Sequence, residues 1–381
     1  MNDAGPNVWR SLAEGAGRAA WRRRSTGRCC IGAMAAAILW IGFVGPAEAR
    51  APNAPANGAA EAAIVSDGAP GGADGLRPKV DPAAGDPAAG DRPEAKREWS
   101  EMALWQAAVL GVVEGLTEYL PVSSTGHLLV TQDLMGLGGA GEEDKAAADA
   151  YAICIQAGAI VAVLGLYWRR VGQAFRGFAG DKLGRRLQAN LLAGFVPAAV
   201  LGLALNDVIK SHLFGPWPVV AAWFVGGAVI LAVVYRRKLR GATPRSGVSL
   251  DELTWKLALL IGFAQCIAMW PGVSRSLITI VGGVLVGLSL PAAVEFSFLL
   301  GVVTLGAATA YDAMKHGPLM AEAYSPLALI VGMAFAFASA AVAVKWMVAY
   351  LNKHSMAIFG FYRVAIAVLV AILIVAGVLN A

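Results

Sequence analysis

The stretch "EGLTEYLPVSSTGH" at residues 114–127 carries side chains that could do chemistry. Glu114 and Glu118 lie four residues apart, so on a helix they share one face, with Cβ atoms about 5–6 Å apart. In apolar surroundings two such carboxylates cannot both stay ionised without a cation or strong hydrogen-bond donors. The pair therefore predicts a divalent-metal or proton-transfer site. The alternative is a helix pair that is solvated at a membrane surface.

Beyond Pro121 the same stretch supplies Ser123, Ser124, Thr125 and His127. Hydroxyl residues followed by glycine at a broken helix can form a turn whose backbone N–H groups face an anion. A histidine beside them can transfer a proton near neutral pH. The alternative is a set of helix-capping hydroxyls with a structural histidine.

A second stretch, "WPGVSRSLIT", places Arg275 between Ser274 and Ser276, with Thr279 one helical turn further on. An arginine inside a membrane costs about 2.5–3.5 kcal/mol on insertion scales, so it needs an anionic partner. That partner is either Glu118, in a structural ion pair, or phosphate oxygens gripped by the planar guanidinium fork. Acids, a base, a hydroxyl nucleophile and an arginine clamp together favour phosphoryl transfer.

The composition indicates that these residues lie in a membrane protein. Of the 381 residues, 57% are hydrophobic and 15% are charged. The net charge of +5 comes from short loops beside apolar runs, which indicates membrane topology signals and no nucleic-acid partner. Six runs approach the roughly 20 residues that a membrane helix needs: 150–168, 189–206, 218–235, 293–312, 326–348 and 357–379.

Loop charge predicts the orientation of the chain. The loops at 169–188 and 236–256 are rich in arginine and lysine, so the positive-inside rule places both in the cytoplasm. The acidic loop at 141–149 and the weakly charged loops at 207–217 and 313–325 then lie outside.

The chain divides into three parts. Residues 1–50 combine a basic lead with an apolar run at 29–45, which indicates a signal peptide, a signal anchor or a mis-assigned start codon. Residues 51–100 are dominated by Ala, Pro, Gly and Asp, a composition that predicts a disordered linker. The membrane domain is expected to cover residues 101–381.

Two regions, 103–137 and 257–290, are interrupted by the polar motifs and do not suit lipid-facing helices. Both suit re-entrant helix hairpins that are buried in protein. "GVVEGLTEYLPVSS" and "GFAQCIAMWPGVSR" align without a gap, so Ser123 falls opposite Ser274, 151 residues later.

Each hairpin is followed by three apolar spans, and an odd number of crossings reverses the second copy. The predicted fold is an all-α integral membrane protein with two inverted repeats, at about 101–237 and 252–381. Each repeat consists of a re-entrant helix hairpin plus three transmembrane helices.

The two motifs resemble the signature motifs of the undecaprenyl-pyrophosphate phosphatase family, which is associated with bacitracin resistance. The resemblance runs from about 103 to 379 and includes "IQAGAI", "EFSFLL" and the C-terminal "YR". It implies removal of the terminal phosphate from undecaprenyl pyrophosphate, which yields the monophosphate carrier for cell-wall synthesis. It also implies a multi-pass protein of the bacterial inner membrane, with the site open to the periplasm.

The resemblance also implies roles for individual residues. Glu114 and Glu118 match the acidic pair, Ser124 the candidate nucleophile, His127 the acid/base and Arg275 the phosphate-binding arginine. The family's hydroxyl-rich, phosphate-binding surround corresponds to Ser123, Thr125, Ser274, Ser276 and Thr279. The family usually has glycine where this chain has Leu277, which puts the tightness of the second loop in doubt.

The cofactor implied is a divalent cation, Mg²⁺ or Ca²⁺, held by Glu114 and Glu118 or by the substrate's own pyrophosphate. The nucleophile is Ser124 or a water molecule. The expected partners are the polyprenyl pyrophosphate substrate and membrane lipids, and the oligomeric state is left open, a homodimer included.

The main alternative is an inverted-repeat transporter or lipid flippase, because broken helices serve transport equally well. A transporter gives no particular reason for a nucleophile, a base and an arginine to occur together, so the site favours an enzyme. Other integral lipid-phosphate phosphatases show a Lys-rich first motif and a final Arg…His…Asp motif, and neither is present here.

Overall fold

The structure is a computed structural model that describes residues 102–137, 142–213 and 215–379. The leader and linker predictions, for 1–50 and 51–100, lie outside these residues. Within them the regular elements are helices, in this order: α3 (Leu104–Thr117), α4 (Ser124–Leu134), α5 (Glu142–Leu166), α6 (Trp168–Arg176), η1 (Gly177–Ala179), α7 (Lys182–Leu213), α8 (Pro216–Leu239), η2 (Leu250–Glu252), α9 (Trp255–Gln265), η3 (Cys266–Met269), α10 (Arg275–Leu285), α11 (Leu290–Ala323), α12 (Pro326–Leu351) and α13 (Ala357–Val375).

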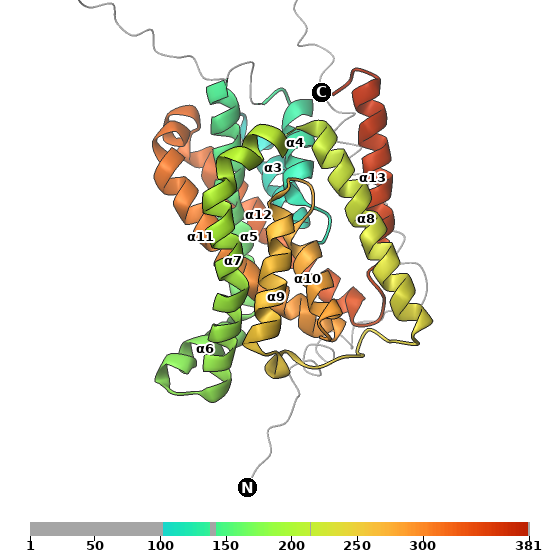
Figure 1. Cartoon of the computed structure of the whole chain (residues 1–381). Coiled ribbons are helices and arrows are strands. Elements are labelled where there is room, and N and C mark those ends of the chain that lie inside the picture. Colours follow the sequence, from blue (N-terminus) through green and yellow to red (C-terminus); the bar gives the residue numbers. More distant parts are fainter. Residues whose placement is uncertain (1–101, 138–141, 214, 380–381) are drawn as a thin grey trace, which may run out of the picture. The chain divides into compact units, whose positions relative to one another are not determined.

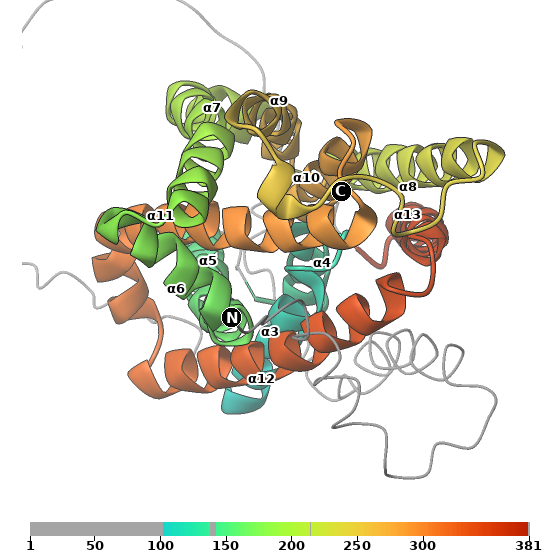
Figure 2. The same cartoon turned by 90° about the horizontal axis from the view of Figure 1, so that it is seen from below.

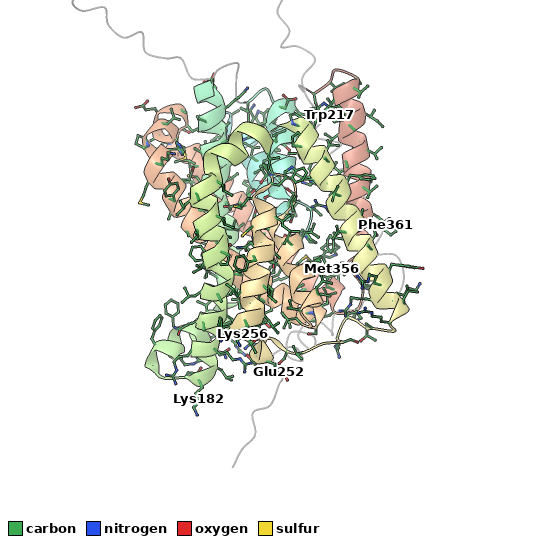
Figure 3. The ribbon with its side chains drawn as sticks, in the orientation of Figure 1. Lys182, Trp217, Glu252, Lys256, Met356 and Phe361 are labelled. Atoms are coloured by element: carbon green, nitrogen blue, oxygen red, sulfur yellow. The ribbon has the colours of Figure 1, made fainter. Side chains whose placement is uncertain are left out.

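Six of the described helices are long and apolar enough to cross a membrane: α5, α7, α8, α11, α12 and α13. Each overlaps one of the six predicted runs, so the all-α, multi-pass membrane fold is confirmed, although α11 continues to Ala323 through most of the predicted loop 313–325. Figure 3 shows Lys182, Glu252 and Lys256 toward one end of these helices and Trp217 toward the other.

The cation-rich segment 169–188, predicted as a loop, contains helical structure. It folds into α6, η1 and the first turns of α7. The Arg170 side chain fastens α6, with Nη1 2.9 Å from an Asp251 oxygen and Nε 2.8 Å from a Glu295 oxygen.

The short apolar helices form two hairpins, α3–α4 and α9–α10. The helix bounds agree with the predicted repeat, because α10 begins and ends 151 residues after α4. In Figure 1 the α3–α4 hairpin reaches down and the α9–α10 hairpin reaches up, so that their breaks meet at mid-height. This arrangement agrees with two inverted repeats, whose opposed orientation across a bilayer stays a prediction.

Glycines let each hairpin approach a long helix closely. A Cβ at Gly111 in α3 would lie 2.3 Å from the Gly332 carbonyl oxygen of α12. A Cβ at Gly262 in α9 would lie 2.6 Å from the Gly194 carbonyl oxygen of α7. Figure 2 shows the same two pairings, α3 against α12 and α9 against α7. Small residues at such crossings are typical of helix packing in membranes.

Candidate active site

The breaks of the two hairpins touch each other. The Ser276 hydroxyl donates to the Leu120 carbonyl oxygen at 2.8 Å, and so links the start of α10 to the turn that follows α3. Where a helix is interrupted inside a membrane protein, its free backbone groups must find partners within the protein, because lipid offers none. The contact satisfies one such carbonyl and fixes the distance between the two motifs.

Three of the predicted catalytic residues meet at the end of α3. The Ser124 hydroxyl donates to the Glu118 oxygen Oε2, and Arg275 Nη2 donates to Oε1 of the same carboxylate at 3.1 Å. Glu118 and Ser124 are 7% and 8% exposed, so the cluster is almost closed to solvent. One carboxylate therefore touches both the candidate nucleophile and the candidate phosphate clamp.

Arg275 is held in a fixed orientation with donor capacity left over. Its Nη1 donates to the Ser297 carbonyl oxygen at 3.0 Å, and its guanidinium carbon lies 5.3 Å from the centre of the Tyr119 ring. Among the described residues its buried Nε has no hydrogen-bond partner. The ion pair with Glu118 fits the structural interpretation, whereas the unused donor fits a further anionic ligand.

The Glu114 carboxylate lies one turn deeper in α3 and is 1% exposed. Neither of its oxygens makes a hydrogen bond within the described part of the chain, although Gln156 and Glu118 are near enough to interact with it. A buried carboxylate in this state needs a proton or a cation. The two glutamates therefore fit the predicted divalent cation, with Glu114 as the carboxylate whose oxygens are unused.

His127 is placed away from the reacting hydroxyl. Its Nδ1 lies 2.6 Å from the Ser123 carbonyl oxygen, which only accepts hydrogen bonds, so Nδ1 carries the proton. Its Nε2 lies 2.7 Å from the Tyr362 hydroxyl, which then donates to the neutral ring. Among the described contacts, none joins the ring to Ser124. Proton transfer between His127 and Ser124 stays a prediction.

The predicted hydroxyl surround divides into a buried and an exposed part. Ser274 accepts from the Leu277 amide at 3.3 Å, and its hydroxyl lies 2.9 Å from that of Ser276. Thr279 donates to the Arg275 carbonyl oxygen at 2.9 Å. These hydroxyls hold the second loop together. Thr125 is exposed on the first turn of α4 and lies outside this network.

Leu277 fits where the family usually has glycine. It lies in the first turn of α10, is fully buried, and does not require a left-handed backbone. The second loop is therefore closed by helix capping at Ser274, and a glycine at 277 is not needed for it.

Arg363 of α13 was missed as a functional residue at the sequence level. It is fully buried and donates to the Pro121 carbonyl oxygen at 3.3 Å and the Gly272 carbonyl oxygen at 2.8 Å. It also reaches the Ala222 carbonyl oxygen of α8 at 2.9 Å. One side chain thus bridges both breaks. Arg363, like Arg275, lies in an apolar run, and an arginine there must have partners, which is the signal that could have identified it.

Tyr362, Tyr119 and Ser297 were likewise missed. Tyr362 and Ser297 fall inside the short segments "YR" and "EFSFLL" that carry the resemblance, and Tyr119 lies within the first motif. Aromatic and serine residues are common in membrane helices, so their types alone gave no signal. Only their contacts, Tyr362 with His127 and Tyr119 and Ser297 with Arg275, reveal them.

The fold and this cluster define a multi-pass membrane protein with a buried carboxylate, hydroxyl and arginine site between two broken helix hairpins. The family described as Bacitracin resistance protein BacA matches residues 107–369, and the chain belongs to this family.

Several bacterial proteins are similar over nearly the same region. A protein of Sorangium cellulosum named undecaprenyl-diphosphatase is 45% identical over 269 residues, covering 70% of this chain and 85% of its own. Undecaprenyl-diphosphatase 2 of Rhodospirillum rubrum is 44% identical over 267 residues, covering 70% and 93%. Undecaprenyl-diphosphatase of Acidovorax ebreus is 42% identical over 269 residues, covering 71% and 94%.

Proposed function

We propose that this protein hydrolyses undecaprenyl diphosphate to undecaprenyl phosphate and inorganic phosphate. The relatives carry the name of this activity, and the chain covers most of their length. The observation that carries the proposal is the contact of Glu118 with both Ser124 and Arg275. This arrangement places a base in hydrogen-bond contact with both a nucleophile and an anion clamp, as phosphoryl transfer requires.

In the proposed mechanism Glu118 accepts the Ser124 proton while the serine oxygen attacks the terminal phosphorus. The anhydride P–O bond breaks, and undecaprenyl phosphate leaves. Water then attacks the phosphoserine, which releases inorganic phosphate and restores the serine. In the alternative route, Glu118 activates a water molecule that attacks the terminal phosphorus directly.

Arg275 stabilises the charge that develops on the transferred phosphoryl group. To do so it exchanges its contact with Glu118 for phosphate oxygens, while its bond to the Ser297 carbonyl keeps the guanidinium aimed. Its unpaired Nε supplies an additional donor. Tyr119 lies beside the guanidinium, with its ring centre 5.3 Å from the guanidinium carbon.

A divalent cation, Mg²⁺ or Ca²⁺, would be held by Glu114 and by substrate phosphate oxygens, with Glu118 contributing a remaining lone pair. When bound, it would neutralise part of the pyrophosphate charge. Glu114 is suited to this role because both its oxygens lack hydrogen bonds, whereas those of Glu118 are already engaged.

The proposed location is the bacterial inner membrane, with the site open to the periplasm. The basis for the orientation is the cation-rich segments 169–188 and 236–256, which the positive-inside rule places in the cytoplasm. Recycling of the lipid carrier there would serve cell-wall synthesis, and faster recycling would confer bacitracin resistance.

Phosphate release by the purified full-length protein tests the proposal. With undecaprenyl diphosphate and Mg²⁺, we expect one phosphate per lipid and loss of turnover in Ser124→Ala or Glu118→Gln. Rapid acid quenching with substrate labelled on the terminal phosphate distinguishes attack by Ser124 from attack by water, because only attack by Ser124 leaves labelled phosphate on the protein. Transfer of the lipid across the vesicle membrane without phosphate release would instead support the transporter alternative.

A further inference from the structure

A cavity lies away from the Glu118 cluster, at the C-terminal end of α8. Its volume is about 370 Å³, which is within the size range of ligand-binding pockets. Its walls come from α8, α10, the start of α11 and the connection between α12 and α13. None of the residues assigned above to the active site lines it.

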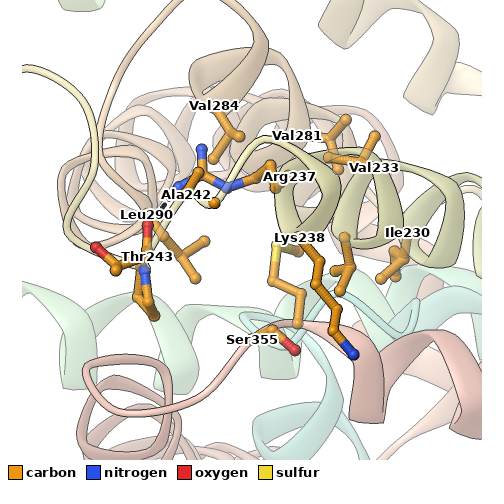
Figure 4. A pocket seen from close by; sticks show the side chains of 14 residues that line it. Ile230, Val233, Arg237, Lys238, Ala242, Thr243, Val281, Val284, Leu290 and Ser355 are labelled. Carbon is orange, nitrogen blue, oxygen red and sulfur yellow. Dashed lines mark hydrogen bonds between the residues drawn. The ribbon is translucent and has the colours of Figure 1, made fainter.

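The walls of this cavity present two kinds of chemistry. Ile230, Val281 and Val284 give it an apolar interior, which suits a hydrocarbon chain. Lys238 and Ser355 give it a polar side, and Figure 4 shows both side chains among those that line the cavity. A ligand that fills it must therefore be amphipathic.

The segment beside the polar side is positively charged, and two of its cations, Arg237 and Lys238, line the cavity. Residues 236–245 contain five cations, Arg236, Arg237, Lys238, Arg240 and Arg245, and no acidic residue. Arg237 donates to the carbonyl oxygens of Thr243 and Ser246, which are neutral. Within the described residues, none of the five cations forms an ion pair with a carboxylate. The ligand that suits this side is an anion.

We propose that the cavity binds an anionic phospholipid of the adjoining membrane leaflet, with its phosphate at Lys238 and Arg237 and one acyl chain between α8 and α10. Basic pockets between transmembrane helices are a known form of anionic-lipid site. A free phosphate ion would leave the apolar walls uncovered, and a neutral lipid would leave the cations unpaired.

The position of the cavity gives the bound lipid a structural effect. Val281 and Val284 lie on α10, the helix whose first residue is Arg275. An acyl chain packed against these valines supports α10 from the end opposite the active site. Binding should therefore raise the thermal stability of the protein even when no substrate is present.

Thermal unfolding of delipidated full-length protein in neutral detergent tests this proposal. We expect phosphatidylglycerol to raise the Tm at concentrations at least tenfold below those of phosphatidylcholine. Lys238→Gln should weaken the phosphatidylglycerol effect about fivefold, the factor for one cation near a membrane surface. Arg240→Gln, on the same segment but not lining the cavity, is the matched control and should change it less than twofold.

A second variant tests the apolar part. Val284→Phe fills the cavity and should abolish the phosphatidylglycerol effect, whereas loss of charge at Lys238 only shifts its concentration dependence. Three outcomes would overturn the proposal. They are equal stabilisation by phosphatidylcholine, equal weakening in the two cation variants, and full stabilisation by inorganic phosphate alone. Phosphate release from undecaprenyl diphosphate is measured separately, so the two proposals can fail independently.

Discussion

Ser123 and Ser274 share one backbone conformation, with φ at 76° in both and ψ at 104° and 115°. They are the non-glycine residues with positive φ in the described part of the chain. Each lies at the break of its hairpin and immediately precedes the second helix. The same strained conformation, 151 residues apart, indicates that both loops solve the same local problem, the reversal of the chain inside the protein.

Glycine at these two positions should have different effects. A strained φ costs about 1–3 kcal/mol, which glycine relieves. Ser123 makes no side-chain cap, so Ser123→Gly should raise the stability by about 1 kcal/mol. Ser274 caps the Leu277 amide, and loss of that cap, about 1 kcal/mol, should offset the gain in Ser274→Gly. Thermal unfolding in detergent measures both, and equal shifts in the two variants would contradict this account.

Arg275→Lys should lower turnover by at least about 10²-fold, because lysine keeps the charge but loses the planar fork. The measurement is phosphate release at saturating substrate and fixed Mg²⁺, alongside thermal stability. If Arg275 were only a partner for Glu118, the lysine variant would keep near-normal turnover, and Arg275→Ala would mainly destabilise the fold.

Arg170→Lys is the matched control for this substitution. Arg170 is also a forked donor, to Asp251 and Glu295, but it lies in α6 and touches no active-site residue. It should lose some thermal stability and keep its turnover. A comparable loss of turnover in both variants would indicate a general effect of replacing an ion-paired arginine.

Substitutions of Glu118 and Tyr362 distinguish the two candidate general bases, Glu118 and His127. Glu118→Gln should lower turnover about 10²–10⁴-fold, the usual worth of a general base. Tyr362→Phe removes the donor to His127 Nε2, so it should cost about 1–3 kcal/mol of stability but less than tenfold in turnover. The reverse ranking of the two turnover losses would make His127 the base and exclude the role given to Glu118.

Glu114→Gln should raise the concentration of Mg²⁺ needed for half-maximal turnover, because the amide offers one neutral oxygen where the carboxylate offers two charged ones. Titration of Mg²⁺ after chelation measures this. Gln265→Ala is a suitable control, since Gln265 is similarly buried and unpartnered at the corresponding place in α9. An unchanged Mg²⁺ dependence in Glu114→Gln would remove Glu114 from the cation site.

The orientation can be tested by cysteine labelling in intact cells. In a chain whose four native cysteines are replaced, Lys145→Cys should react with an impermeant reagent, whereas Arg176→Cys should react only after permeabilisation. Both positions are exposed in the structure, so accessibility within the protein does not limit the reaction. Labelling of Arg176→Cys in intact cells would show that the orientation is the reverse of the one proposed. It would also contradict an active site that opens to the periplasm.

The six spans and two hairpins could be predicted because their signals are local: long apolar runs, and a proline with polar residues that interrupts a shorter one. Glu118, Ser124 and Arg275 could be placed together because the two motifs occupy equivalent positions of the predicted repeats. Helix α6 was not predicted, and the contacts of its Arg170 with Asp251 and Glu295, which are distant in sequence, are a feature that the local sequence does not show.

Side-chain direction was the other quantity that the sequence did not determine. Thr125 follows Ser124 directly, yet it is exposed, because neighbouring residues of a helix point about 100° apart. His127 belongs to the same motif, but its ring turns toward Tyr362, 235 residues later. Such contacts depend on how α4 and α13 are packed.

The bridge made by Arg363 bears on the order in which the protein is assembled. Helix α13 is the last described helix, so during synthesis both hairpin breaks exist before their shared donor does. Until α13 inserts, the carbonyls of Pro121 and Gly272 lack these hydrogen bonds, and His127 lacks Tyr362. A chain stopped before α13 would contain every residue of the Glu118 cluster but not the support that joins its two halves.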